Sequence, residues 1–123
     1  MVKKGYKRSA RVGELLRQEL SDLLRREVKD PRVQGVTVTD VAVSDDLSRA
    51  RIFYNTSLCS HPREEVQQAL ESAMGFLRSQ LRERMNLRQT PQLSFHYDES
   101  FDEGARMDVV LAGVTREGGK GRA

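Results

Sequence analysis

The sequence predicts a small α+β domain in which three strands form one sheet and the helices pack on one face of it. Three segments space their apolar residues by three and four positions, as amphipathic helices do. Three others alternate apolar with polar residues, as half-buried strands do. The chain has 123 residues, 37% of them hydrophobic, which is enough for one domain with one modest core. We therefore expect a two-layer sandwich.

The first helix is expected over residues 9–28, where apolar residues recur on one face. These are Val12, Leu15, Leu16, Leu20, Leu23 and Leu24. Ser9 is a plausible N-cap for this helix. Asp30-Pro31 ends it, because proline disfavours helical geometry in the residue before it. Residues 1–8 then form a flexible basic arm ahead of the folded domain.

Two strands are expected next, over residues 35–44 and 49–57. The valines of the first strand change phase between Val38 and Val41. A strand can do this only through an irregularity, so we predict a bulge near residues 39–40. The connection between the strands is short and rich in turn-forming residues. The two strands should therefore form an antiparallel hairpin.

The second half of the chain predicts two helical stretches and a strand. A helix starts within residues 60–64, where proline and glutamate suit a first turn. Gly75 interrupts the helical pattern, which then continues to about Asn86. A third strand follows over residues 92–98. The folded domain is expected to extend to residue 112 through a weakly patterned segment, and the Gly-rich, charged tail over 113–123 should be disordered.

Charge is distributed unevenly along the chain. Five basic residues precede the first acid, Glu14: Lys3, Lys4, Lys7, Arg8 and Arg11. The formal net charge is +3, so the rest of the chain is net negative, and residues 98–108 are strongly acidic. A basic arm favours a polyanionic partner, although such a segment can also be a solvated tail without a partner.

The composition also indicates a compartment. A single cysteine excludes an internal disulfide and suits a reducing environment. No apolar run approaches the roughly 20 residues that a membrane span needs. We expect a cytoplasmic protein that does not enter a membrane.

Ala73-Met74-Gly75 is the most informative segment, because two helical stretches meet there without a loop between them. Glycine costs roughly 1 kcal/mol in a helix interior relative to alanine. At such a joint, the first amide groups of the second helix lack intrahelical partners and suit a phosphate. On a helical wheel Gly75, Ser79 and Arg82 lie opposite the apolar face, flanked by Arg78. The alternative is a glycine tolerated in a solvated amphipathic helix.

Five segments, taken together, resemble the ribosome-binding factor A family. They are Arg11-Val12-Gly13, Asp30-Pro31-Arg32, Val41-Ala42-Val43-Ser44-Asp45-Asp46-Leu47, Ala50-Arg51-Ile52-Phe53-Tyr54 and Leu93-Ser94-Phe95-His96-Tyr97-Asp98-Glu99-Ser100. The resemblance covers about residues 8–112. The chain departs from the family's pattern near residues 104–110, where the family often continues with a regular helix.

The resemblance implies a KH-like fold of type II topology, in the order α-β-β-α-kink-α-β. It also implies that Ala73-Met74-Gly75 is similar to the family's Ala-x-Gly kink, which replaces the Gly-x-x-Gly loop of ordinary KH domains. The family binds the free small (30S) ribosomal subunit and its 16S rRNA during late maturation. It is linked to processing of the 5′ end of that RNA and to growth in the cold. It performs no covalent chemistry.

We accordingly expect a monomer that binds RNA through eight residues. They are Lys7, Arg8, Arg11, Ala73, Gly75, Arg78, Ser79 and Arg82. These contacts should go mainly to phosphates, because few aromatic residues are available to stack on bases. Two alternatives remain from the residues alone: an adaptor whose acidic end docks a basic protein, and a nuclease that trims precursor RNA.

Other chemically reactive residues are better explained by structure than by catalysis. His61 and His96 have no partners at metal-ligand spacing and are expected at the surface. Cys59 precedes a helix that would mildly acidify its thiol, but no catalytic partner accompanies it. Asp45 and Asp46 belong to a turn. No phosphate-binding loop or nucleophile motif occurs. We therefore expect no enzyme activity, metal, cofactor or small-molecule substrate.

Overall fold

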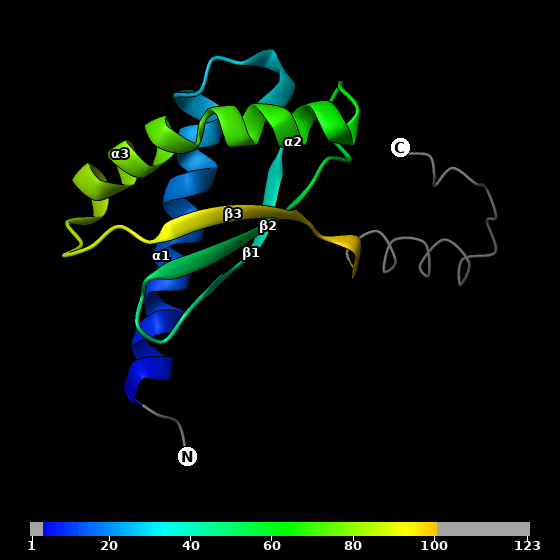
Figure 1. The fold of residues 1–123 in the computed structure, drawn as a ribbon. Helices are drawn as coiled ribbons and strands as arrows, with labels where there is room; N and C mark the ends of the chain where they lie inside the picture. The colour runs from blue at the N-terminus through cyan, green and yellow to red at the C-terminus, as the bar shows by residue number, and fades with distance from the viewer. Residues whose placement is uncertain (1–3, 101–123) are drawn as a thin grey trace.

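The structure, a computed structural model, describes residues 4–100, and from residue 8 onward it describes their side chains as well (Figure 1). Its elements are α1 (Lys4–Arg26), a short 3₁₀ helix (Pro31–Val33), β1 (Thr37–Val43), β2 (Arg49–Asn55), α2 (Arg63–Ser72), α3 (Met74–Met85) and β3 (Gln92–Tyr97). This order confirms the predicted succession of helices and strands. The weak segment and the tail expected after residue 100 lie outside the described residues.

The three strands form one mixed sheet in the order β1-β2-β3. β1 and β2 are antiparallel, as their short connection predicted, whereas β3 runs parallel to β2. The α2–α3 pair connects these two parallel strands (Figure 1). The inner face of β2 is buried at Ala50, Ile52 and Tyr54, which are at most 1% exposed, while Arg49 and Arg51 on the outer face are exposed. The helices therefore cover one face of the sheet.

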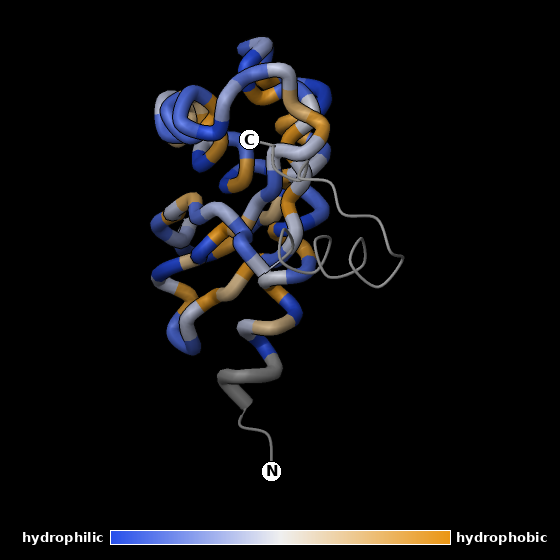
Figure 2. Tube along the Cα trace, turned by 90° about the vertical axis from the view of Figure 1, so that its right-hand side faces the viewer, coloured by the Kyte–Doolittle hydropathy of each residue, from blue (hydrophilic) through white to orange (hydrophobic). Residues whose placement is uncertain are grey.

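The core lies between the inner face of the sheet and the apolar sides of the three helices. α1 contributes Leu16, Leu20 and Leu23, and α3 contributes Leu77 and Leu81, all fully buried. Burying one such side chain stabilises the fold by about 1.5–3 kcal/mol. In Figure 2 hydrophobic and hydrophilic positions are interspersed along each element, as expected where each element buries one side. The core thus fixes which side of α3 faces outward.

The predicted bulge is present in β1. The register with β2 shifts between Val38 and Asp40, so that Val38 faces Tyr54 and Val41 faces Ile52. Both valines therefore contribute to the inner face, although they differ in sequence phase. The bulged residue, Thr39, donates a hydrogen bond to the Asp98 carboxylate at 2.5 Å.

The start of α1 was predicted wrongly. The helix begins at Lys4, and Ser9 lies inside it, 5% exposed, so Ser9 is not the N-cap. Residues 4–8, expected as part of a flexible arm, are helical. The reason is that Ser9 continues the buried face of Val12 and Leu16, at spacings of three and four, and lysine and arginine favour helix. Leu15, expected on this face, is 46% exposed.

A polar contact fixes α2 over the sheet. The Tyr54 hydroxyl of β2 donates to the side-chain carbonyl of Gln67 in α2. The Gln67 amide in turn donates to the Phe95 carbonyl of β3 at 3.1 Å. Burial raises the pKa of Tyr54 to about 12, so its hydroxyl keeps its proton. These bonds hold the helix that leads into the kink.

Candidate nucleic-acid interface

One residue, Ala73, separates α2 from α3. Its N–H donates to the carbonyls of Ala69 at 3.0 Å and Leu70 at 3.2 Å, and its own carbonyl accepts from the Leu77 N–H at 2.9 Å. Its ψ of 0° departs from regular helical geometry. The hydrogen-bond ladder of α2 thus ends where that of α3 begins. The predicted helical break without a loop is confirmed, and Figure 1 shows the bend.

The start of α3 has no side-chain cap. Alanine at the N-cap position supplies no acceptor, and the first turn contains no acidic residue. The first N–H groups of a helix have no acceptor within that helix, and the helix dipole makes this end positive. Backbone donors without a side-chain cap, at the positive end of a helix dipole, are features that bind a phosphate group.

Gly75 is exposed at this start, and nothing in the described chain requires a glycine there. Its φ is not positive, and a Cβ built on it would meet no atom within 4 Å. Gly13 in α1 is different, because a Cβ there would lie 3.0 Å from the Val41 carbonyl oxygen of β1. Gly13 permits close packing inside the molecule. Gly75 leaves helical backbone open to a group from outside.

A hollow of about 330 Å³ adjoins the kink. Ala73 and Phe76 line it from the kink, and Val28 and Lys29 line it from the chain after α1. Phe76 is a large hydrophobic residue, yet it is 43% exposed. Consecutive helical residues are about 100° apart, so burial of Leu77 turns Phe76 outward. Sequence reasoning missed both Lys29 and Phe76. Only the return of the chain after α1 brings Lys29 to the kink.

Two acidic residues, Glu27 and Asp30, also line this hollow, and the charge of Asp30 is neutralised by a neighbouring arginine. The Asp30 carboxylate accepts from the backbone and side chain of Arg32, with an ion pair at 2.7 Å. These hydrogen bonds, with the side-chain one foremost, lower the pKa of Asp30 to about 2. Asp30 is also the N-cap of the 3₁₀ helix, so its carboxylate stabilises the turn that follows α1.

Arg78 has partners within the chain. Its Nε donates to the Pro91 carbonyl at 3.0 Å and its Nη2 to the Thr90 carbonyl at 2.8 Å. The guanidinium is half-buried and holds the loop between α3 and β3. The sequence placed Arg78 beside the polar stripe, but it could not show these acceptors 12 and 13 residues further on. A charge reversal at Arg78 would therefore disturb the loop as well as any RNA contact.

Arg82 is exposed, and it makes no hydrogen bond or ion pair within residues 8–100. It lies seven residues after Gly75, so the two share one side of α3. Ser79 lies between them and is half-buried. Of the residues in the predicted stripe, Gly75 and Arg82 are therefore the two that are exposed on the same side of α3.

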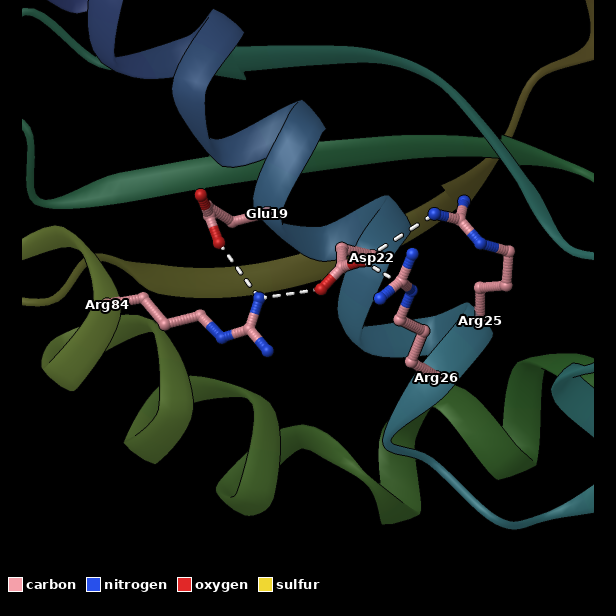
Figure 3. A network of polar contacts seen from close by, with 5 residues as sticks. All are labelled: Glu19, Asp22, Arg25, Arg26 and Arg84. Atoms are coloured by element: carbon pink, nitrogen blue, oxygen red, sulfur yellow. Dashed lines mark hydrogen bonds and ion pairs between the residues drawn. The ribbon is translucent and has the colours of Figure 1, made fainter.

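Arg84 joins α3 to α1. It donates to Glu19 at 3.0 Å and to Asp22 at 2.9 Å, and Arg25 and Arg26 also pair with Asp22 (Figure 3). The hydrogen bond from Arg84 lowers the pKa of Asp22. This network links α3 to α1 through side-chain contacts.

The predicted residues of α1 lie apart from the kink. Arg8 and Arg11 are exposed on the half of α1 that points away from α2 and α3 (Figure 1). At about 1.5 Å per residue, Arg11 lies roughly 22 Å along the helix from Arg26, the end nearer the kink. Lys7 is helical, but its side chain lies outside the description. The structure thus brings Ala73, Gly75, Ser79 and Arg82 together and leaves Arg8 and Arg11 as a second basic area.

The residues set aside for catalysis were mostly placed as expected. His96 is exposed, and Asp46 accepts hydrogen bonds from Ser44 and Ser48 in the turn. His61 is half-buried rather than at the surface. Burial raises the pKa of the Cys59 thiol, so the expected acidification was wrong.

Two further features are absent from residues 4–100. No group of three or more histidine, cysteine or acidic side chains there is arranged to hold a metal ion. Within the same range, no helix combines the length and apolar character needed to cross a bilayer.

The element order and the mixed sheet with helices on one face define a KH-like α+β domain of type II topology. A protein-family model described as ribosome-binding factor A matches residues 8–111. The chain belongs to the ribosome-binding factor A family.

Known proteins support this assignment. Ribosome-binding factor A of Azoarcus sp. (strain BH72) is 44% identical over 114 residues, 93% of this chain and 90% of that protein. The crystal structure of ribosome-binding factor A from Thermus thermophilus matches with a TM-score of 0.64 at 26% identity, over 72% of this chain and 94% of the other. A homology model of the Thermus thermophilus factor, fitted into a cryo-electron microscopy map of its 30S complex, has a TM-score of 0.61 at 25% identity, over 74% and 96% of the two chains.

Proposed function

We propose that this protein binds the free 30S subunit through its 16S rRNA and assists late maturation without covalent chemistry. The observation that carries the proposal is the uncapped, exposed start of α3, where Gly75 leaves the backbone open. The related Thermus protein, whose homology model was fitted into a map of its 30S complex, supports the choice of partner.

The contact would form at the kink. A phosphate of the RNA backbone would accept from the first N–H groups of α3, and the next phosphates would follow the exposed side of the helix to Arg82. Lys29 lies close enough to the same hollow to add a positive charge, and the exposed Phe76 ring offers apolar contact to a ribose or a base. Phosphate contacts position a protein without reading sequence. The folded shape of the subunit would therefore supply specificity.

The role in maturation follows from binding alone. A protein that stabilises one conformation of immature rRNA changes which sites processing enzymes can reach, since a ligand favours the state it binds better. We extend the proposal to processing at the 5′ end of the 16S precursor and to growth in the cold, where misfolded RNA rearranges slowly. Binding of this kind requires no cofactor, and a monomer in the cytoplasm suffices.

Co-sedimentation with purified 30S subunits tests the proposal. Wild-type protein should sediment with the subunits, and binding should weaken as salt rises, because phosphate contacts release counterions. Arg82→Glu should lower the affinity roughly tenfold, as expected for replacing an attraction to phosphate by a repulsion. Arg88→Glu is the matched control, because Arg88 is also exposed but follows the end of α3. Equal binding by both variants, both still folded, would refute the assigned surface.

A further inference from the structure

The face of the sheet turned away from the helices carries an arrangement that the kink does not explain. The outward residues of β2 are Arg49, Arg51 and Phe53, which alternate with the buried inner residues. The parallel register places Phe53 beside His96 of β3, and Arg51 beside Ser94. No helix within residues 4–100 packs on this side. Basic and aromatic groups from two strands therefore form one continuous outer surface.

The aromatic groups of this surface lie together. The rings of Phe53 and His96 have centroids 5.6 Å apart and are tilted by 36°. The Arg51 guanidinium carbon lies 5.6 Å from the centre of the Phe53 ring. Ser94 Oγ and His96 Nε2, 2.8 Å apart, share a hydrogen bond that restrains the imidazole. Flat rings next to an arginine are the groups on which nucleic-acid bases stack.

The positive charges on this face have no acidic partner within the described chain. Arg49 and Arg51 form no ion pair there, whereas Arg17 of α1 pairs with Glu14 and Arg84 of α3 pairs with Glu19. Uncompensated arginines on an otherwise open surface favour an anionic partner from outside.

Acidic residues near this face are engaged elsewhere. Asp46, in the turn between β1 and β2, accepts from Ser44 and Ser48. Asp40, level with Phe53 in the register, accepts from the Val41 N–H. Cross-strand partners share one face of a sheet, so Asp40 lies on the outer face at its β1 edge, whereas Arg49 and Arg51 lie on the central strand β2. The middle of the outer face is left to the arginines.

The outer face is also hollowed where Arg49, Arg51 and His96 meet, and Phe53, which contacts Arg51 and His96, lies outside the lining of this hollow. A concavity of about 740 Å³ is lined by all three strands, including Ala42, Arg49, Arg51, Ser94 and His96. This lies within the roughly 300–1,000 Å³ typical of sites for small organic ligands, so one or two nucleotides would fit. The short side chain of Ala42 leaves space beside Arg49 and Arg51.

We infer that the outer face of the sheet binds a short single-stranded segment of RNA. Bases stack on Phe53 and His96, while Arg49 and Arg51 contact the phosphates on either side. The inference rests on the proposed function, because it takes rRNA as the partner. It adds a second contact surface, on the opposite side of the sheet from the helix layer that contains the kink. One molecule could then hold an unpaired strand and a structured part of the same RNA, and each contact would raise the effective concentration for the other.

The test measures binding of the full-length protein to a fluorescein-labelled single-stranded RNA of ten nucleotides by anisotropy. Phe53→Leu removes the ring but keeps an apolar side chain, and Arg51→Gln removes the charge but keeps most of the length. Phe53→Leu should weaken binding roughly tenfold, which lies within the cost of losing one stacked base, and Arg51→Gln should weaken it several-fold through the lost phosphate contact. Arg88→Gln, a matched loss of charge elsewhere, should bind as the wild type does. Thermal unfolding of each variant confirms that it is folded.

Two further arms separate the possible failures. Arg82→Glu should bind 30S subunits roughly tenfold more weakly yet keep its affinity for the ten-nucleotide strand, because the kink and the outer face are different surfaces. Weakened 30S binding in Arg82→Glu, with unchanged oligonucleotide binding in Phe53→Leu and Arg51→Gln, overturns the inference and leaves the proposed function standing. Failure of the wild type to bind 30S subunits overturns the proposed function itself.

A competition experiment distinguishes RNA from an acidic protein. A poly-glutamate peptide carrying the same number of charges should displace the RNA poorly, because it offers no base to stack. Displacement at equal charge concentration would identify the outer face as a docking surface for an acidic protein segment and would contradict the inference.

Discussion

Arg82 and Arg84 lie two residues apart on α3, yet only one of the two side chains is paired within the described chain. Arg84 pairs with Glu19 and Asp22 of α1, whereas Arg82 has no partner within the described chain. Gly13 and Gly75 show the same contrast, since the packing of β1 explains the first and nothing in the described chain explains the second. Groups that the fold satisfies maintain the fold. Groups that it leaves open are the better candidates for an external partner.

The largest effect is expected at Arg78, whose side chain is hydrogen-bonded within the chain. Arg78→Ala removes two hydrogen bonds to the carbonyls of Thr90 and Pro91. Leaving part-buried acceptors unpaired should lower the free energy of unfolding by about 2 kcal/mol. Urea denaturation measures this against Arg88→Ala, which removes an exposed arginine. Equal stability of the two variants would show that Arg78 does not hold the loop.

The two glycines give the next prediction. Gly75→Ala should raise the free energy of unfolding by about 0.5–1 kcal/mol, because alanine is the better helix former and its Cβ meets nothing. The same variant should bind 30S subunits several-fold less tightly. Gly13→Ala, the matched change, should lower stability because its Cβ crowds the Val41 carbonyl at 3.0 Å. A Gly75→Ala variant that is stabilised and binds normally would leave the glycine without a role in binding.

A smaller effect is expected at the junction of α1 and α3 (Figure 3). Arg84→Met keeps the apolar length of the side chain but removes both ion pairs. Thermal unfolding should occur at a modestly lower temperature, because exposed ion pairs contribute little. Affinity for 30S subunits should stay at the wild-type level, in contrast to Arg82→Glu. If Arg84→Met weakens 30S binding as much as Arg82→Glu does, an ion pair within the chain does not distinguish a structural arginine from an RNA-binding one.

The smallest effect concerns acid stability at Asp30. Its folded-state pKa of about 2 lies below the unfolded value of about 4. A depressed carboxyl pKa stabilises the fold above the unfolded pKa, and this contribution disappears as pH falls from about 4 to about 2. Asp30→Asn should therefore flatten the fall of the melting temperature over that interval. Asp45→Asn serves as the control, and an identical pH profile for all three proteins would contradict the assignment.

The alternation of apolar residues was enough to predict the hairpin and its bulge. Val38 and Val41 must both face the core, so the change of phase between them required an extra residue. The start of α1 was missed because Ser9 has the chemistry of a cap. Ser9 lies inside the helix because it is buried against the core, and burial is a property of the packed molecule.

The site could be predicted only in part. The break at Ala73 and the open glycine follow from local sequence, because both depend on a few consecutive residues. The separation of Arg78 from Arg82 does not, since it depends on carbonyls that the loop before β3 brings back to α3. The outer face was missed for a similar reason. Phe53 and His96 become neighbours only through the parallel register of β2 and β3.

Hydrogen–deuterium exchange at the start of α3 tests the central claim most directly. The exchange of the peptide spanning residues 73–77 would be compared in the protein alone and in its complex with 30S subunits. If rRNA phosphate accepts from these N–H groups, their exchange should slow markedly in the complex, while a peptide from residues 19–25 of α1 should change little. Unchanged exchange over 73–77 in a saturated complex would contradict the account.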